Sequence, residues 1–120
     1  MARTIIAVVD DLFFASKIRG TAEQLGLNVN FPRALQALLE SARTEPPDLV
    51  ICDLHATRID PLDLAKEFKS DERLRAIRLV GFFSHVQTEL ERGAEQAGFD
   101  RVMPRSLFTK RLPDILAGGE

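Results

Sequence analysis

Leu49-Val50-Ile51-Cys52-Asp53 is a short apolar run that ends abruptly in an acid, and similar runs occur twice more. Ile5-Ile6-Ala7-Val8-Val9 leads into Asp10-Asp11, and Leu79-Val80-Gly81-Phe82-Phe83 leads into Ser84. Runs this short and this rich in Val, Ile and Phe predict strands that are buried on both faces of a sheet. The polar residue after each run then marks the point where a strand ends.

Segments with apolar residues three and four positions apart lie between these strands and predict helices. Helices are expected at 12–25, 33–44, 62–69, 86–97 and 107–117, with further short strands at 28–31 and 101–103. Pro113 indicates that the last helix restarts near Leu112. This alternation predicts an α/β fold, a three-layer, doubly wound, five-stranded parallel sheet with helices on both faces. The length predicts one domain over residues 1–120, with no output domain.

The carboxyl ends of parallel strands lie side by side, and ligands of open α/β sheets bind at that edge. Asp10, Asp11 and Asp53 are therefore expected to converge there, with the hydroxyl of Ser84 beside them. Like charges packed together are unfavourable unless a cation joins them, and Mg2+ prefers oxygen ligands. Helix capping is the alternative role for Asp10 and Asp11, but no capping role explains an acid directly after the run 49–52.

Composition argues against nucleic-acid-binding, membrane-spanning and secreted proteins. The chain carries 16 basic and 18 acidic residues, and this net charge of -2 argues against nucleic acid as a main partner. No apolar run approaches the roughly 18 residues of a membrane span, and no signal-peptide pattern is present, so a cytoplasmic location is expected. The only cysteine, Cys52, is expected to act as a small buried hydrophobic residue.

Together these motifs resemble the receiver domain of two-component response regulators, over roughly residues 4 to 117. The matching stretches are Val9-Asp10-Asp11, residues 47–54, Asp60-Pro61-Leu62-Asp63-Leu64, Ser84 and Ala97-Gly98-Phe99-Asp100. The resemblance implies a flavodoxin-like topology with strand order 2-1-3-4-5. It also implies a phospho-accepting signalling domain rather than a turnover enzyme.

The same resemblance implies a role for each acidic residue. Asp53 is the expected phosphate acceptor, whose carboxylate attacks a phosphoryl donor to give an acyl phosphate. Asp11 is expected to bind Mg2+ directly and Asp10 largely through water, with Asp53 and the backbone carbonyl of His55 completing the site. Ser84 is expected to hydrogen-bond the bound phosphoryl group. The implied partners are a histidine kinase or other phosphodonor and a downstream protein, and a homodimer could form through the fourth helix, last strand and last helix.

Arg105-Ser106 stands where the family has Lys, usually followed by Pro. Arg is a planar fork rather than a compact point charge, so the two are not equivalent. Arg105 could lock bidentate onto Asp53 or Asp10, bind a phosphoryl oxygen, or point to solvent. A cis Arg105–Ser106 bond would cost about 3 kcal/mol, so a trans bond is expected.

Two further positions leave other functions open. Val102 stands at the family's switch aromatic, and His85 stands where the family prefers a small residue. These departures favour an alternative function as a phosphorylation-independent pseudo-receiver that serves as an interaction module. A transition-metal site that adds His55 and His85 to the acids is a less favoured alternative. A small flavodoxin-type or phosphatase-type enzyme is the third, although residues 10–13 provide neither a Gly-rich phosphate loop nor an Asp-x-Asp motif.

Overall fold

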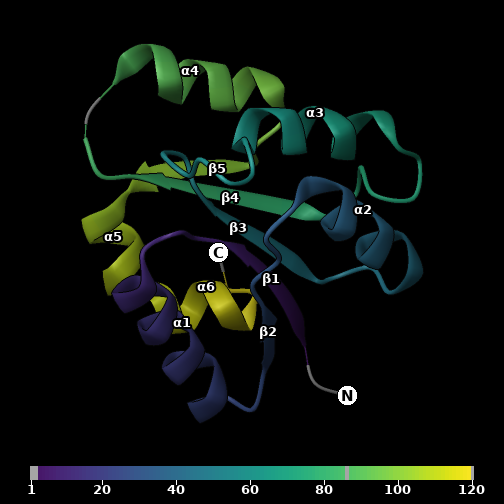
Figure 1. Cartoon of the computed structure of the whole chain (residues 1–120). Helices are drawn as coiled ribbons and strands as arrows, with labels where there is room; N and C mark the ends of the chain where they lie inside the picture. The colour runs from purple at the N-terminus through teal and green to yellow at the C-terminus, as the bar shows by residue number, and fades with distance from the viewer. Residues whose placement is uncertain (1–2, 86, 120) are drawn as a thin grey trace.

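The computed structural model describes residues 3–85 and 87–119, which form a five-stranded parallel sheet between two layers of helices (Figure 1). The elements in chain order are β1 (Thr4–Val8), α1 (Leu12–Gln24), β2 (Asn28–Asn30), α2 (Leu35–Thr44), β3 (Leu49–Asp53), α3 (Pro61–Ser70), β4 (Arg78–Phe83), α4 (Thr88–Ala97), β5 (Arg101–Pro104), α5 (Arg105–Lys110) and α6 (Leu112–Ala117). The strand order is β2-β1-β3-β4-β5, with every pair parallel. The predicted fold class and topology are therefore confirmed.

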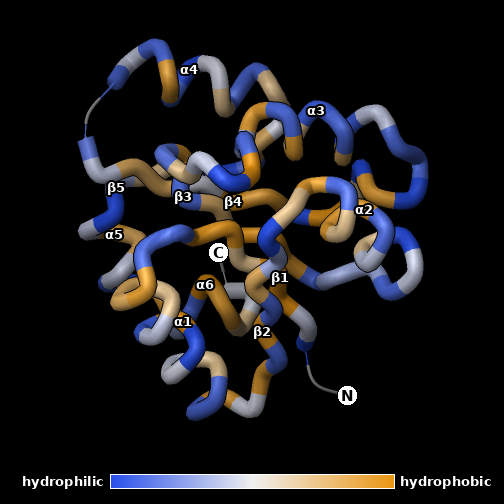
Figure 2. The backbone as a smooth tube through the Cα atoms, viewed as in Figure 1, coloured by the Kyte–Doolittle hydropathy of each residue, from blue (hydrophilic) through white to orange (hydrophobic). Residues whose placement is uncertain are grey.

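Alternating residues of the strands supply two separate cores, because successive side chains of a strand point to opposite faces. Ile5 and Ala7 pack with α1, α5 and α6 on one face, whereas Ile6 and Val8 pack with α2, α3 and α4 on the other. Figure 2 shows the hydrophobic residues concentrated along the central strands. Burial on both faces explains why these strands read as unbroken apolar runs. Cys52 is fully buried in the core beneath α2, α3 and α4, as predicted.

Three phenylalanine rings fill the core beneath α1 and α5. The Phe82 ring stacks on Phe108 at a centroid distance of 4.5 Å and meets Phe14 at 5.1 Å. Phe82 and Phe108 are fully buried, and Phe14 is nearly so. Offset and tilted aromatic pairs of this kind stabilise a core beyond the area that they bury. The cluster fixes the first turns of α1 and α5 against the end of β4.

Several helix boundaries differ from the sequence prediction. The helix expected at 33–44 begins at Leu35, because Ala34 is extended at φ -141° and ψ 141° and Pro32 lies before the helix. The last helix begins earlier than predicted, at Arg105. It divides at Arg111 and restarts at Leu112 with Pro113 in the first turn of α6, as predicted. Proline lacks an N–H and is favoured in a first turn. The start expected at Val86 lies outside the described residues, and α4 begins at Thr88.

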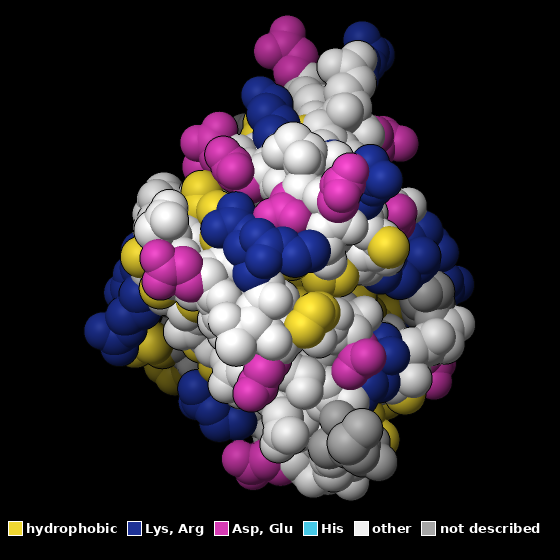
Figure 3. All heavy atoms as spheres, turned by 90° about the vertical axis from the view of Figure 1, so that its right-hand side faces the viewer, with side chains coloured by type: hydrophobic (Ala, Val, Ile, Leu, Met, Phe, Trp, Pro, Cys, Tyr) yellow, Lys and Arg dark blue, Asp and Glu magenta, His cyan; other side chains and the backbone are white. Residues whose placement is uncertain are grey.

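Charged side chains of both signs surround the amino ends of the strands, on the face shown in Figure 3. Asp71, which follows α3, accepts a 2.8 Å hydrogen bond from Nε of Arg43, and Nε of Arg73 lies 3.7 Å from its other oxygen. The hydrogen bond from Arg43, with a backbone bond from Arg73, holds the pKa of Asp71 below its usual range. None of the helices among residues 3–85 and 87–119 is both long and apolar enough to cross a membrane.

Candidate acidic site at the carboxyl ends of β1 and β3

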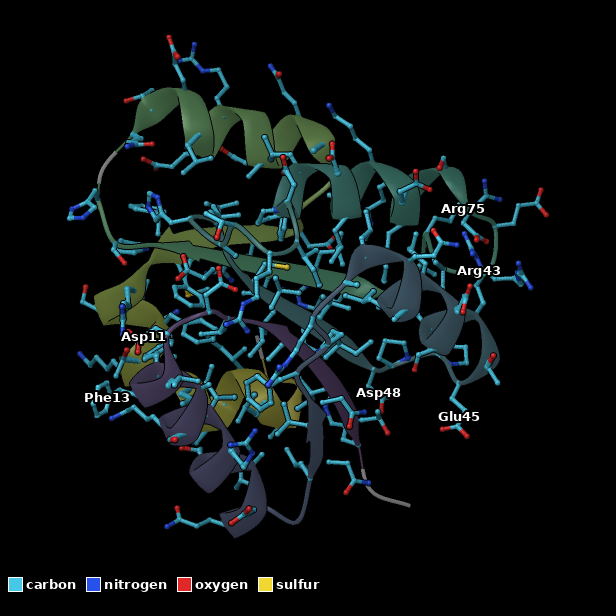
Figure 4. The ribbon with its side chains drawn as sticks, viewed as in Figure 1. Asp11, Phe13, Arg43, Glu45, Asp48 and Arg75 are labelled. Atoms are coloured by element: carbon cyan, nitrogen blue, oxygen red, sulfur yellow. The ribbon has the colours of Figure 1, made fainter. Side chains whose placement is uncertain are left out.

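The ends of β1 and β3 bring the acids of the two strands to one edge of the sheet. These strands pair in parallel register with Val8 opposite Cys52, so the chain reaches Asp10 and Asp53 at neighbouring strand ends. Figure 4 shows Asp11 on this side of the molecule and Asp48, at the amino end of β3, on the opposite side. The predicted convergence of strand ends is therefore present, and the contacts of each side chain decide what the site can do.

Asp11 caps α1 and also binds Arg105. Its Oδ1 accepts hydrogen bonds from the backbone N–H groups of Phe13 at 2.9 Å and Phe14 at 3.2 Å. Its Oδ2 lies 3.3 Å from a terminal nitrogen of Arg105. The backbone bond from Phe14, helped by Arg105 and Phe13, holds the pKa of Asp11 below its usual value. Helix capping and ion pairing thus both favour the charged carboxylate at this position.

A pH dependence of stability follows from these contacts of Asp11. Because its pKa is lower in the folded chain, the carboxylate stabilises the fold above the ordinary value of 3.8, and this contribution is lost as the pH falls through the lower native pKa. Asp11→Asn keeps a capping side chain but removes the charge. The free energy of unfolding in urea should therefore be lower for Asp11→Asn at pH 7, and the difference should shrink below pH 3.8. A difference independent of pH would show that the charge contributes nothing.

Arg105 is fixed by two contacts rather than pointing freely to solvent. Besides its bond to Asp11, its guanidinium lies 4.1 Å from the centroid of the Phe14 ring, a cation–π arrangement. The arginine therefore pairs with Asp11 through one nitrogen, and not with Asp53 or Asp10 in the bidentate geometry considered from the sequence. No cis bond occurs in the described chain, so the Arg105–Ser106 bond is trans as expected.

Asp53 ends β3, and its surroundings shape the loop that follows. Its Oδ1 accepts a 2.9 Å hydrogen bond from the backbone N–H of His55, and its carbonyl accepts one from Ala56 at 3.0 Å. The N–H of Leu54 donates to the carbonyl of Phe82 at 2.8 Å, which extends the pairing with β4 by one residue. The Asp53 side chain is half-buried, so one carboxylate oxygen is tied to the loop in a site that solvent still reaches.

Asp10 contacts the loop after β3, and no pattern in the sequence predicts this contact. Its Oδ2 accepts hydrogen bonds from the backbone N–H of Thr57 at 2.8 Å and from its hydroxyl at 3.2 Å. Nothing in the spacing of Thr57 marks it as a partner of a residue 47 positions away. The bond joins the ends of β1 and β3 directly.

Ser84 and His85 follow β4 and are both exposed. The ring of His85 meets that of His55 edge-on at a centroid distance of 5.9 Å. The Nε2 atom of His55 is buried and has no hydrogen-bond partner in the described chain. The hydroxyl of Ser84, which is predicted to contact a phosphoryl group, is thus accessible. The two imidazole rings bring the loop after β3 and the loop after β4 into contact.

The carboxylates are not arranged as a preformed metal site. Within residues 3–85 and 87–119, no group of three or more His, Cys, Asp and Glu side chains has the geometry to hold a metal ion. Asp10, Asp11 and Asp53 instead each accept hydrogen bonds from different donors. The side-chain positions therefore do not support the transition-metal alternative with His55 and His85. The donor set at the strand ends is oxygen, which suits Mg2+ chemically.

Comparison with known proteins identifies the fold family. The polar-differentiation response regulators DivK of Brucella abortus and Brucella suis are 23% identical over 116 residues, which cover 97% of this chain and 94% of the relative. A putative response regulator of Chloroflexus aurantiacus superposes with a TM-score of 0.81 at 19% identity, covering 98% and 99% of the two chains. The chain has the fold of response-regulator receiver domains. No family model matches it.

A third similar structure has a bound metal. The receiver domain of the sensor histidine kinase PA1611 from Pseudomonas aeruginosa, with a magnesium ion coordinated in its active-site cleft, superposes with a TM-score of 0.82 at 18% identity. The alignment covers 97% of this chain and 95% of that one. Receiver domains are signalling domains, mainly phospho-acceptors rather than turnover enzymes.

Proposed function

We propose that this chain is a single-domain signalling protein that accepts a phosphoryl group on Asp53. The observation that carries the proposal is the register of β1 and β3, which brings Asp10, Asp11 and Asp53 to neighbouring strand ends. Asp53 is half-buried and one of its oxygens is held by the His55 N–H, so the other is the candidate nucleophile. Attack on a phosphoryl donor would form the acyl phosphate and release the donor's leaving group.

Mg2+ is the proposed cofactor, held by Asp11, Asp53 and the backbone carbonyl of His55, with Asp10 acting largely through water. When bound, the ion would offset repulsion between the carboxylates and the incoming phosphoryl oxygens. The donor chemistry supports this assignment, although Asp11 is paired with Arg105 in the structure described here. Arg105 therefore competes for the carboxylate that the ion requires.

Removing the arginine should accordingly strengthen metal binding. Arg105→Ala frees Asp11 from its ion pair and withdraws a positive charge from the site, so the affinity for Mg2+ should rise by roughly threefold to tenfold. Isothermal titration calorimetry measures the change. Arg92→Gln, which removes an exposed arginine from α4, is the matched control and should leave the affinity within about twofold. Weaker Mg2+ binding by Arg105→Ala would mean that the arginine supports the metal site.

Exposed Ser84 is the proposed contact for the bound phosphoryl group, and Arg105 is a second one once it leaves Asp11. The proposed partners are a histidine kinase or other phosphodonor and a downstream protein, in the cytoplasm, with no direct role for nucleic acid or membrane. Leu12 and Phe13, which are 77% and 89% exposed beside the site, offer the phosphodonor an apolar contact. Output would pass through α4, β5 and α5, the face through which a homodimer could also form.

A phosphorylation-independent pseudo-receiver is the second candidate, and the Arg105–Asp11 pair favours it. Val102 adds to this, because the half-buried valine at the switch position packs into the core and has no ring to reorient when Ser84 is engaged. In this function the fold would present its surfaces to a partner constitutively.

Metal and phosphoryl mimicry distinguish these two functions. Amide NMR spectra recorded with millimolar Mg2+ and then with beryllofluoride should show shifts at Asp53, Ser84 and Arg105, because the mimic occupies the position of an aspartyl phosphate. Shifts that extend into β5 and α5 would support a phosphorylation-driven signal. Unchanged spectra under both conditions would overturn the proposed phospho-acceptor function and leave the pseudo-receiver.

A further inference from the structure

A hollow of about 390 Å³ opens beside Asp10. It lies on the side of β1 that faces β2, away from β3. Its walls come from α1, from the segment that joins β2 to α2 and from the loop after β3. A volume of this size is sufficient for a small-molecule ligand. Asp53 does not line the hollow, so the proposed phospho-acceptor site does not account for it.

The charged lining of this hollow is mainly basic. Arg19 of α1, Arg33 and Arg58 reach it from three different segments, and Asp10 is the one acid in the lining. None of the three arginines forms an ion pair with a carboxylate of the described residues, and the Oδ2 atom of Asp10 accepts a hydrogen bond from Thr57 instead. In a chain whose net charge is -2, three guanidinium groups around one hollow form a local excess of positive charge. Such a cluster is complementary to a dianion.

The rest of the hollow is largely apolar. Leu12, Phe31, Pro32 and Ile59 contribute to its walls. The guanidinium of Arg19 lies 4.7 Å from the centroid of the Phe31 ring, which holds this long side chain in a defined place at the hollow. An arginine held in this way loses less freedom when it binds an anion. The site therefore combines three positive charges, of which that of Arg19 is held in place by Phe31, with a surface that suits an apolar or aromatic group.

We propose that this hollow binds a small phosphomonoester whose dianionic phosphate is attached to an apolar or aromatic body, as in a nucleoside monophosphate. The phosphate would be held by Arg33 and Arg58, with Arg19 as the third cation, because guanidinium groups bind phosphate oxygens in paired hydrogen bonds. The attached body would pack against Phe31 and Ile59. Binding here requires neither a metal ion nor the carboxylate of Asp53.

Calorimetry and amide NMR with adenosine 5′-monophosphate, glycerol 3-phosphate and inorganic phosphate, all in EDTA, test this site. We expect saturable binding of adenosine 5′-monophosphate, with shifts centred on Arg19, Phe31 and Arg58. Inorganic phosphate should bind roughly tenfold more weakly, because it lacks the body that packs on the apolar wall. Glycerol phosphate binding as weakly as inorganic phosphate would assign the selectivity to the aromatic body, and equal binding of all three would overturn the apolar part of the proposal.

Charge variants separate a built site from general attraction of an anion to arginine. Arg33→Gln and Arg58→Gln should each weaken adenosine 5′-monophosphate binding by roughly tenfold or more, since each removes a charged hydrogen-bond donor. Arg92→Gln on α4 is the matched control and should change it by less than about twofold. Asp53→Asn should bind normally, so that failure of the phospho-acceptor proposal leaves this one standing. No saturable binding by the unmodified chain, or an equal loss in Arg92→Gln, would overturn it.

Discussion

Asp53→Asn should abolish phosphorylation of the chain by a small-molecule donor such as phosphoramidate in the presence of Mg2+. The amide that replaces the carboxylate is a poor nucleophile and cannot form an acyl phosphate, whereas its shape still accepts the His55 N–H bond at the end of β3. The loss should be complete rather than graded, because the bond that holds the phosphoryl group is missing. Intact-protein mass spectrometry measures it directly, as the gain of one phosphoryl group by the unmodified chain and none by the variant.

Asp63→Asn is the matched control for this experiment. Asp63 lies exposed in the first turn of α3, close in sequence to the site but outside its hydrogen-bond network around Asp53. Its replacement should leave the extent of phosphorylation unchanged. A phosphoryl group that still appears on Asp53→Asn would place the acceptor elsewhere, and one that fails to appear on the unmodified chain would favour the pseudo-receiver.

The strand ends could be predicted from the sequence because burial and topology decide them together. An apolar run buried on both faces has few alternatives, and an acid that follows it must lie at the edge of the sheet. The positions of Asp10, Asp11 and Asp53 follow from this, as does the end of β4 at Phe83 before Ser84. The strand order, by contrast, is predicted only through the resemblance to a family, because local patterns do not specify which strands are neighbours.

Side-chain partners within the site could not be predicted in the same way. The sequence left Asp53, Asp10, a phosphoryl oxygen and solvent open as surroundings of Arg105. The observed pair with Asp11 depends on α5 starting at Arg105 itself and on the Phe14 ring beside the guanidinium. No apolar periodicity precedes Leu107, so the early start of that helix has no signal in the pattern. The bond from Thr57 to Asp10 likewise depends on the path of a loop rather than on any repeat in the sequence.

The aromatic cluster beneath α1 and α5 connects the stability of the fold to the arrangement of the site. Phe82 stacks on Phe108 and meets Phe14, and the Phe14 ring in turn carries the guanidinium of Arg105. The backbone carbonyl of Phe82 also accepts the N–H of Leu54, directly after Asp53. A cavity at Phe82 would therefore weaken the packing that holds the segments after β1 and after β3 in place.

Phe82→Ala should lower the free energy of unfolding by about 3 to 5 kcal/mol, because it removes a fully buried ring and leaves a cavity between two others. This is a large share of the roughly 5 to 15 kcal/mol that stabilises a typical domain. Phe13→Ala removes the same ring from a side chain that is 89% exposed, so its effect should stay within about 0.5 kcal/mol. Urea unfolding followed by circular dichroism compares the two. Similar losses for both variants would mean that the rings of Phe14, Phe82 and Phe108 do not form the packed cluster on which the first turns of α1 and α5 rest.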